Sequence, residues 1–78
     1  MPATTQEVRR FLLEQNAEFR HLADEHTRCE TQLEQLLNHP YLSAEDLALE
    51  TTLKKLKLRL KDQMESLIAR QLQAGIPH

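Results

Sequence analysis

The sequence predicts an all-α protein, an antiparallel helical hairpin of coiled-coil type that follows a short N-terminal helix and dimerises into a helical bundle. Glycine occurs once and proline three times in 78 residues, which is too few turn residues for a β or α/β domain. Leucine, glutamate, glutamine, lysine, arginine and alanine dominate, as they do in long helices. Apolar residues recur every three or four positions. A chain of this length is expected to form one domain, residues 1–78.

The first helix is expected at about residues 5–15. Thr4 and Glu7 have the spacing of a capping box, in which each side chain accepts a hydrogen bond from an unpaired amide at the helix start. The apolar face of this helix would hold Val8, Phe11 and Leu12.

The second helix is expected at about residues 17–38. Asn16 is a strong N-cap residue, so we expect a break or kink there, with an uninterrupted helix as the alternative. Apolar positions then alternate in steps of three and four, which indicates a heptad seam. The seam residues of this helix are Phe19, Leu22, His26, Cys29, Leu33 and Leu36.

A loop is expected at residues 39–43, because Pro40 disfavours helical geometry in the residue before it. Ser43 is a good N-cap for a third helix at about residues 44–73, and Gly75 is a typical stop. A short loop makes the flanking helices antiparallel neighbours. With Asn38 opposite Ala44, the pairs across the seam are expected, to within a turn, to be Leu33 with Leu49, Cys29 with Leu53, His26 with Leu56, Leu22 with Leu60, and Phe19 with Gln63 and Met64.

The same register predicts the pairing of charges beside the seam. Glu30 is expected to lie between Glu50 and Lys54.

Self-association is expected, because so short a chain buries little of its surface. One cysteine excludes an internal disulfide and fits a reducing compartment. Several apolar residues lie off the seam, which favours a second interface and a symmetric homodimer in a four-helix bundle. The candidate contact residues of this interface are Leu37, Tyr41, Leu47 and Leu58.

Five basic residues between positions 54 and 61 suggest an alternative, a nucleic-acid-associated regulatory protein. The net charge of −2 and the absence of interleaved aromatic residues make nucleic acid the weaker hypothesis. A helix also spreads these side chains around its circumference. We therefore expect them to form solvated flanks of the hairpin, with Lys54, Lys55 and Lys61 as possible contacts for a partner.

No chemistry is predicted. The chain has no glycine-rich phosphate loop and no recognisable catalytic set, so we expect no enzyme activity, cofactor or small-molecule substrate. His26 and Cys29 lie one turn apart and could join a zinc site shared by two chains, but a seam role is the simpler interpretation. Neither a signal peptide nor a membrane span is visible, which indicates a cytoplasmic protein.

Two segments resemble the YdcH-like family of small bacterial proteins of unknown function. The similarity covers about residues 9 to 70, and it implies a helical hairpin and a bacterial source but no activity. Two departures are Ala17, where the family often has proline, and Cys29, where it usually has an aliphatic residue. The matching segments are Asn16-x-x-Phe19-x-x-Leu22-x-x-x-His26 and Leu53-Lys54-Lys55-x-x-Leu58-x-Leu60-Lys61-Asp62.

The function expected from these observations is a non-enzymatic interaction or scaffolding module. It would act as a coiled-coil-like homodimer, with an unidentified protein as a further partner. Burial of apolar seams would supply affinity, and the charged flanks would select orientation.

Overall fold

A computed structural model describes residues 3–76, and within this range the chain forms three helices and no strand. The helices are α1 (Thr5–Gln15), α2 (Ala17–Leu37) and α3 (Ala44–Ala74). The predicted all-helical class is confirmed. Compared with the expected bounds, α2 ends one residue earlier and α3 one residue later. Residues 1–2 and 77–78 of the predicted domain lie outside the described residues.

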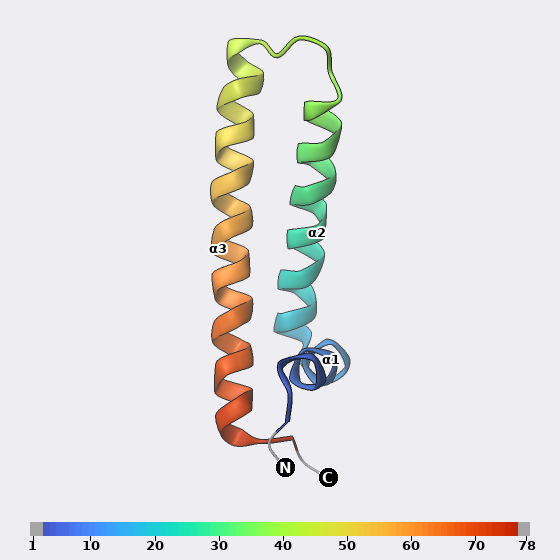
Figure 1. The fold of residues 1–78 in the computed structure, drawn as a ribbon, viewed down its shortest axis with the longest axis vertical. Helices are drawn as coiled ribbons and strands as arrows, with labels where there is room; N and C mark the ends of the chain where they lie inside the picture. The colour runs from blue at the N-terminus through green and yellow to red at the C-terminus, as the bar shows by residue number, and fades with distance from the viewer. Residues whose placement is uncertain (1–2, 77–78) are drawn as a thin grey trace.

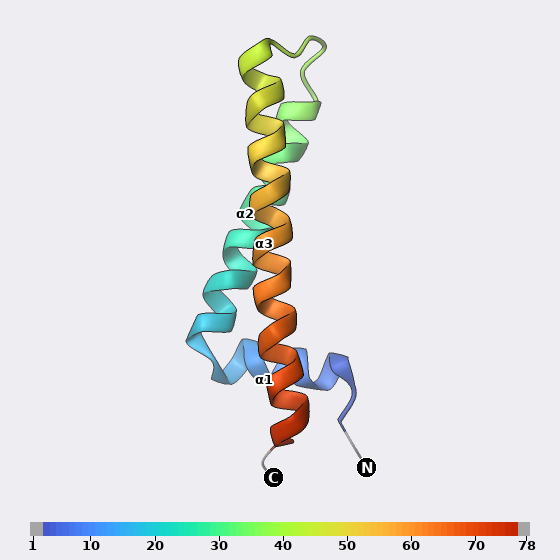
Figure 2. The same cartoon turned by 90° about the vertical axis from the view of Figure 1, so that its left-hand side faces the viewer.

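The two long helices lie side by side and run in opposite directions (Figure 1). The short helix α1 crosses the pair at the end remote from the connecting loop, roughly perpendicular to the long axis (Figure 2). It contacts both α2 and α3. The result is a rod with extents of 52 × 20 × 16 Å, in which three helices meet at one end and two continue to the other.

The chain turns sharply at Asn16, which closes α1 and opens α2. Its backbone is extended, with φ −123° and ψ 109°. The Asn16 amide donates to the Leu12 carbonyl at 2.8 Å, and its side-chain Oδ1 accepts from the Phe19 amide at 2.9 Å. One residue thus serves unpaired groups at two helix ends. The predicted break is present, and Ala17 occupies the first position of α2 without proline.

The start of α3 is held by a reciprocal pair of hydrogen bonds. The Asp46 amide donates to Ser43 Oγ at 3.1 Å, and the Ser43 amide donates to Asp46 Oδ2 at 3.0 Å. The hydrogen bond from the Ser43 backbone, followed by that from its hydroxyl, lowers the pKa of Asp46 from its ordinary value. At the other end Gly75 adopts φ 80°, a conformation that favours glycine, and its amide donates to the Gln71 carbonyl at 2.8 Å.

The core is densest where α1 crosses the long helices. Phe19 and Val8 are fully inaccessible to solvent, and Leu12 is 2% exposed. These side chains form one cluster with the seam between α2 and α3. The remaining buried members of the cluster are Leu22, Cys29, Leu33, Leu53, Leu60, Met64 and Ile68.

Two residues that the sequence analysis placed in the seam are exposed. Leu49 is 47% exposed and Leu56 38%, whereas Leu53 and Leu60 are buried. The buried residues of α3 along the seam are Leu53, Leu60, Met64 and Ile68. The assignment of Leu49 and Leu56 to the seam is therefore corrected, and both lie on its flank.

The register of α2 against α3 also differs from the expected one, by about one turn. Glu30 does not lie between Glu50 and Lys54: its Oε2 lies 3.8 Å from the Nζ of Lys57. Figure 1 shows the reason, since α3 begins beyond the end of α2. The loop extends beyond the end of α2 before α3 begins. Each α2 residue therefore faces a residue later in α3 than the expected one.

Replacing Phe19 with alanine should strongly destabilise the protein, because it leaves a cavity at the junction of all three helices. We expect a loss of about 3–5 kcal/mol in the free energy of unfolding. Phe11→Ala is the matched control: Phe11 is only partly buried at the edge of the same cluster, and we expect a loss of at most about 2 kcal/mol. Urea denaturation followed by circular dichroism measures both, and equal losses would contradict the described core.

The lowered pKa of Asp46 should make part of the stability depend on acid pH. Because this pKa is lower in the folded state, the contribution is fully present above the ordinary aspartate pKa. It is lost as pH falls through the folded-state value. Acidification across that window should therefore destabilise the wild type more than Asp46→Asn, as measured by urea denaturation at stepped pH.

Asp24→Asn is the control for the pH experiment. Asp24 is exposed and accepts no side-chain hydrogen bond among residues 3–76. If Asp46→Asn keeps the wild-type pH dependence of stability, or if Asp24→Asn loses it, the pH dependence does not come from the cap at Ser43 and Asp46.

Candidate interaction surfaces

Large apolar side chains remain uncovered on all three helices and in the loop. The most exposed are Tyr41 at 89% and Leu58 at 60%. In the part of the chain that the structure describes, no helix is sufficiently long and apolar to cross a membrane. Among residues 3–76, the exposed large hydrophobic residues are Leu13, Leu37, Tyr41, Leu47, Leu49, Leu56, Leu58 and Leu72.

A polar cluster occupies one edge of the seam. The Nδ1 of His26 lies 3.0 Å from Oε1 of Glu30, and the other Glu30 oxygen faces Lys57 at 3.8 Å. The His26 and Lys57 side chains are 21% and 38% exposed. Leu56 and Lys57 both lie within one turn of the buried Leu53 and Leu60, and Lys57 is the one that reaches Glu30 of α2. A lysine stem therefore covers the apolar seam here, while its ammonium reaches the carboxylate at the rim.

The seam cysteine is a core residue. Cys29 is 2% exposed and belongs to the apolar cluster. His26 turns toward Glu30, so its ring is engaged at the surface while the thiol faces inward. Between Ala3 and Ile76, no three His, Cys, Asp or Glu side chains form a group that could hold a metal ion. A zinc site shared by two chains would need this thiol at the surface, so the geometry favours the packing role.

The basic run of α3 is divided between two sides of the helix. Lys54, Lys57 and Lys61 line one surface together. Lys55 and Arg59 line a different hollow beside Leu56 and Thr52. The helical period causes this division, since residues three and four apart share a side.

The first side forms a groove between α2 and α3, which we call the basic groove. It has a volume of about 380 Å3 and no carboxylate among its lining residues. Of its lysines, Lys54 is paired through its Nζ with Oε1 of Glu50 at 3.1 Å. The lining residues are His26, Leu33, Leu37, Lys54, Lys57, Leu58 and Lys61.

A second groove, which we call the uncharged groove, lies between the same helices near the loop. Its volume is about 250 Å3, and none of the residues that line it is Asp, Glu, Lys or Arg. The exposed Leu49 stands on its α3 wall, and Leu56 follows seven residues later in the adjoining hollow. The lining residues are Gln32, Gln35, Leu36, His39, Leu49 and Leu53.

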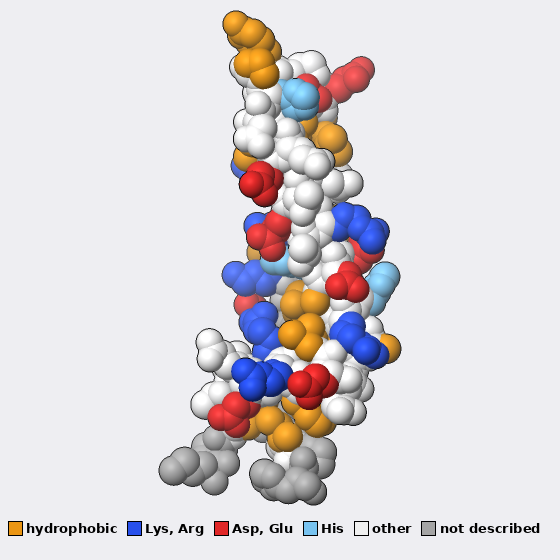
Figure 3. Space-filling view, turned by 90° about the vertical axis from the view of Figure 1, so that its right-hand side faces the viewer, with side chains coloured by type: hydrophobic (Ala, Val, Ile, Leu, Met, Phe, Trp, Pro, Cys, Tyr) orange, Lys and Arg blue, Asp and Glu red, His pale blue; other side chains and the backbone are white. Residues whose placement is uncertain are grey.

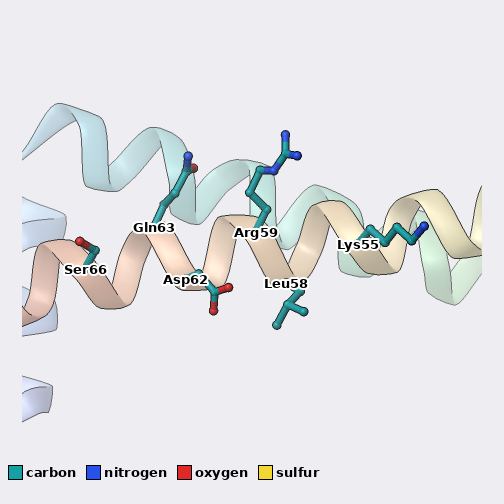
Figure 4. A pocket seen from close by; sticks show the side chains of 6 residues that line it. All are labelled: Lys55, Leu58, Arg59, Asp62, Gln63 and Ser66. Carbon is teal, nitrogen blue, oxygen red and sulfur yellow. The ribbon is translucent and has the colours of Figure 1, made fainter.

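Two further surfaces have a different character. Figure 4 shows a hollow whose lining side chains all come from α3, with Leu58 and Arg59 projecting to opposite sides of the helix. Side chains of one helix make only a shallow surface. The face turned toward the viewer in Figure 3 carries acidic and basic side chains intermingled along much of its length. Neither surface has the continuous apolar or single-sign character of the two grooves.

Residues 19–68 match the family model described as a protein of unknown function, DUF465. The chain belongs to the DUF465 family. This is the family that includes YdcH-like small proteins, so the resemblance seen in the sequence is confirmed. Comparison of this DUF465 protein with curated proteins and with solved structures gave no significant match. The matched segment begins within α2 and ends within α3, so it contains both grooves and leaves out α1.

The structure of the DUF465 chain brings together only some of the contact residues predicted from sequence. Four of them, Leu37, Lys54, Leu58 and Lys61, line the basic groove. Lys55 lies on the other side of α3. Leu47 and Tyr41 are exposed but line neither groove.

Sequence reasoning missed the uncharged groove. The signal was the pair of glutamines at positions 32 and 35 in a helix otherwise rich in charge. Their significance depends on Leu49 standing across from them, and the sequence analysis placed Leu49 in the seam.

The buried position of Cys29 predicts slow reaction with a thiol reagent. In the native protein the thiol is reached only through an opening of the seam, so we expect labelling at least about tenfold slower than in concentrated urea. Timed labelling with a chromogenic disulfide reagent measures both rates. The chain has one cysteine, so the signal has one source. Equal rates in the two conditions would show that this thiol is not in the core.

Proposed function

We propose that this DUF465 protein is a non-enzymatic, cytoplasmic interaction module whose helical hairpin pairs with a second copy of the chain. The observation that carries the proposal is the uncharged groove with Leu49 and Leu56 beside it. Their exposed fractions of 47% and 38% leave an apolar line along α3 that the chain itself does not cover.

The composition of this groove supports an interface. Charged residues make up 28% of the whole chain, yet the lining of the groove contains none. Depletion of charge at the centre of a contact is the compositional feature that distinguishes protein interfaces from other surface. The charged Lys55 and Arg59 flank Leu56 at one end, as expected for the polar rim of such a contact.

The shape of the molecule supports a symmetric pair. A side of a rod with extents of 52 × 20 × 16 Å offers an area comparable to the roughly 800 Å2 per partner of a standard interface. A two-fold axis would place each groove against its copy, so the same residues bury one another. Two antiparallel helices from each chain would then form a four-helix bundle.

The chemistry of the described surface supports a binding role over a catalytic one. Both grooves are flanked by leucine and long polar side chains, and neither holds a paired nucleophile and base. The alternative proposal, nucleic-acid binding through the basic run, has less support. The run is split between two sides of α3, and two of its members already face carboxylates.

Light scattering coupled to gel filtration tests the dimer. At tens of micromolar we expect twice the mass of one chain for the wild type, and the mass of one chain for Leu49→Glu with Leu56→Glu. Burying four carboxylates at a two-fold contact costs more than the interface gains.

Leu58→Glu with Leu47→Glu is the matched control. It adds the same charge on leucines outside the uncharged groove and should leave the mass doubled. A wild-type mass of one chain would exclude the dimer. Dissociation of the control variant alone would place the contact at Leu58 instead.

A further inference from the structure

We infer that the basic groove is a docking site for an acidic amphipathic helix of a different protein. This site lies on the other flank of α3 from the uncharged groove, so it does not depend on the dimer. Its three lysines and three leucines stand on the two walls of one depression of about 380 Å3.

The apolar part of the groove lies deep and on both rims. Leu33, at 8% exposure, forms the floor on the α2 side. Leu37 and Leu58 are 54% and 60% exposed and stand on opposite helices. A third helix laid between two helices contacts both rims and the floor, which is how amphipathic helices occupy hydrophobic grooves. The occupant would therefore present large apolar residues at intervals of three or four.

The charges select the sign of the occupant. Lys54, Lys57 and Lys61 follow one another at steps of three and four, so they line one wall over about 10 Å, or two helical turns. The neighbouring hollow shares Lys57 and Lys61 and adds Arg9 from α1, with Glu65 as its one acidic member. Acidic residues spaced by three and four along a partner helix would match this row.

The ion pairs within the chain leave positive charge in the groove available to such a partner. Lys54 and Lys57 each face one carboxylate, at 3.1 Å and 3.8 Å. No carboxylate of residues 3–76 forms an ion pair with Lys61. An acidic helix would meet the charge of Lys61 directly and would share Lys54 and Lys57 with the carboxylates of Glu50 and Glu30.

Two other classes of anionic ligand fit this distribution less well. The single head group of a fatty acid would need its positive charges gathered at one end, whereas these are spread over two turns. A nucleic-acid strand would set phosphates against Leu33 and Leu37 and would find no Phe, Tyr or Trp side chain among the lining residues to stack on its bases.

Fluorescence anisotropy with a labelled synthetic helix tests the inference. The probe is a peptide of roughly 20 residues, long enough to form a helix, with leucines at steps of three and four and glutamates beside them. A control peptide replaces every glutamate with lysine. We expect saturable binding of the acidic peptide only. Absence of binding at 0.2 mM peptide, or equal binding of both peptides, would overturn the inference.

Matched charge variants locate the site. Lys54→Gln with Lys61→Gln should weaken acidic-peptide binding about tenfold, since two exposed ion pairs are lost. Lys55→Gln with Arg59→Gln removes the same charge from the other side of α3 and should change binding less than twofold. Equal weakening by the two variants would show general attraction and overturn the groove assignment.

Two further measurements separate the possible outcomes. Tighter binding of the wild type to a double-stranded DNA of mixed sequence, or to vesicles rich in phosphatidylserine, would overturn the choice of an acidic helix. The mass of the Lys54 and Lys61 variant by light scattering should equal that of the wild type. Failure of peptide binding with an intact dimer would thus reject the groove and leave the proposed function standing.

Discussion

The structure depends on the junction where α1 crosses the long helices. Two helices alone bury only one stripe each, and most of the seam residues here retain a few per cent of exposure. The largest fully inaccessible side chains of residues 3–76, Phe19 and Val8, lie at the crossing. Asn16 makes this possible, because it ends one helix and begins the next without an intervening loop. The turn at a single residue directs α1 back across α2 and α3.

Local signals in the sequence predicted the helices well. Helix caps, the loop proline and the terminal glycine act on residues close to them in the sequence. Their effects can therefore be predicted without knowledge of the tertiary contacts. The break at Asn16 is of this kind. The reciprocal cap at Ser43 was only partly foreseen, because Asp46 fills the position where glutamate or glutamine is usual. At Thr4 only half of the expected capping box is present: the Glu7 amide donates to the Thr4 hydroxyl at 3.1 Å, and among residues 3–76 no hydrogen bond joins the Thr4 amide to the Glu7 carboxylate.

The surfaces were harder to predict because they depend on register. A shift of about one turn along α3 changes which residues of the two helices face each other, and the loop conformation that sets it is not encoded in periodicity. Leu56 and Lys57 illustrate the difficulty. Periodicity favours the apolar residue of the pair for the seam, yet the lysine is the one that contacts Glu30 of α2, and its long stem can substitute for an aliphatic side chain. Leu49 and Leu56 lie on the flank of the seam, with exposed fractions of 47% and 38%.

The unequal ends of the rod have a consequence for its dynamics. A helix that packs against a single neighbour opens locally at a lower free-energy cost than a helix in a three-helix core. Amides near the loop should therefore exchange with solvent through partial unfolding events that leave the Phe19 cluster intact. The uncharged groove lies in this less protected half, so a second chain bound there would order backbone as well as bury surface. Association and local folding would be thermodynamically coupled at one end of the molecule and independent at the other.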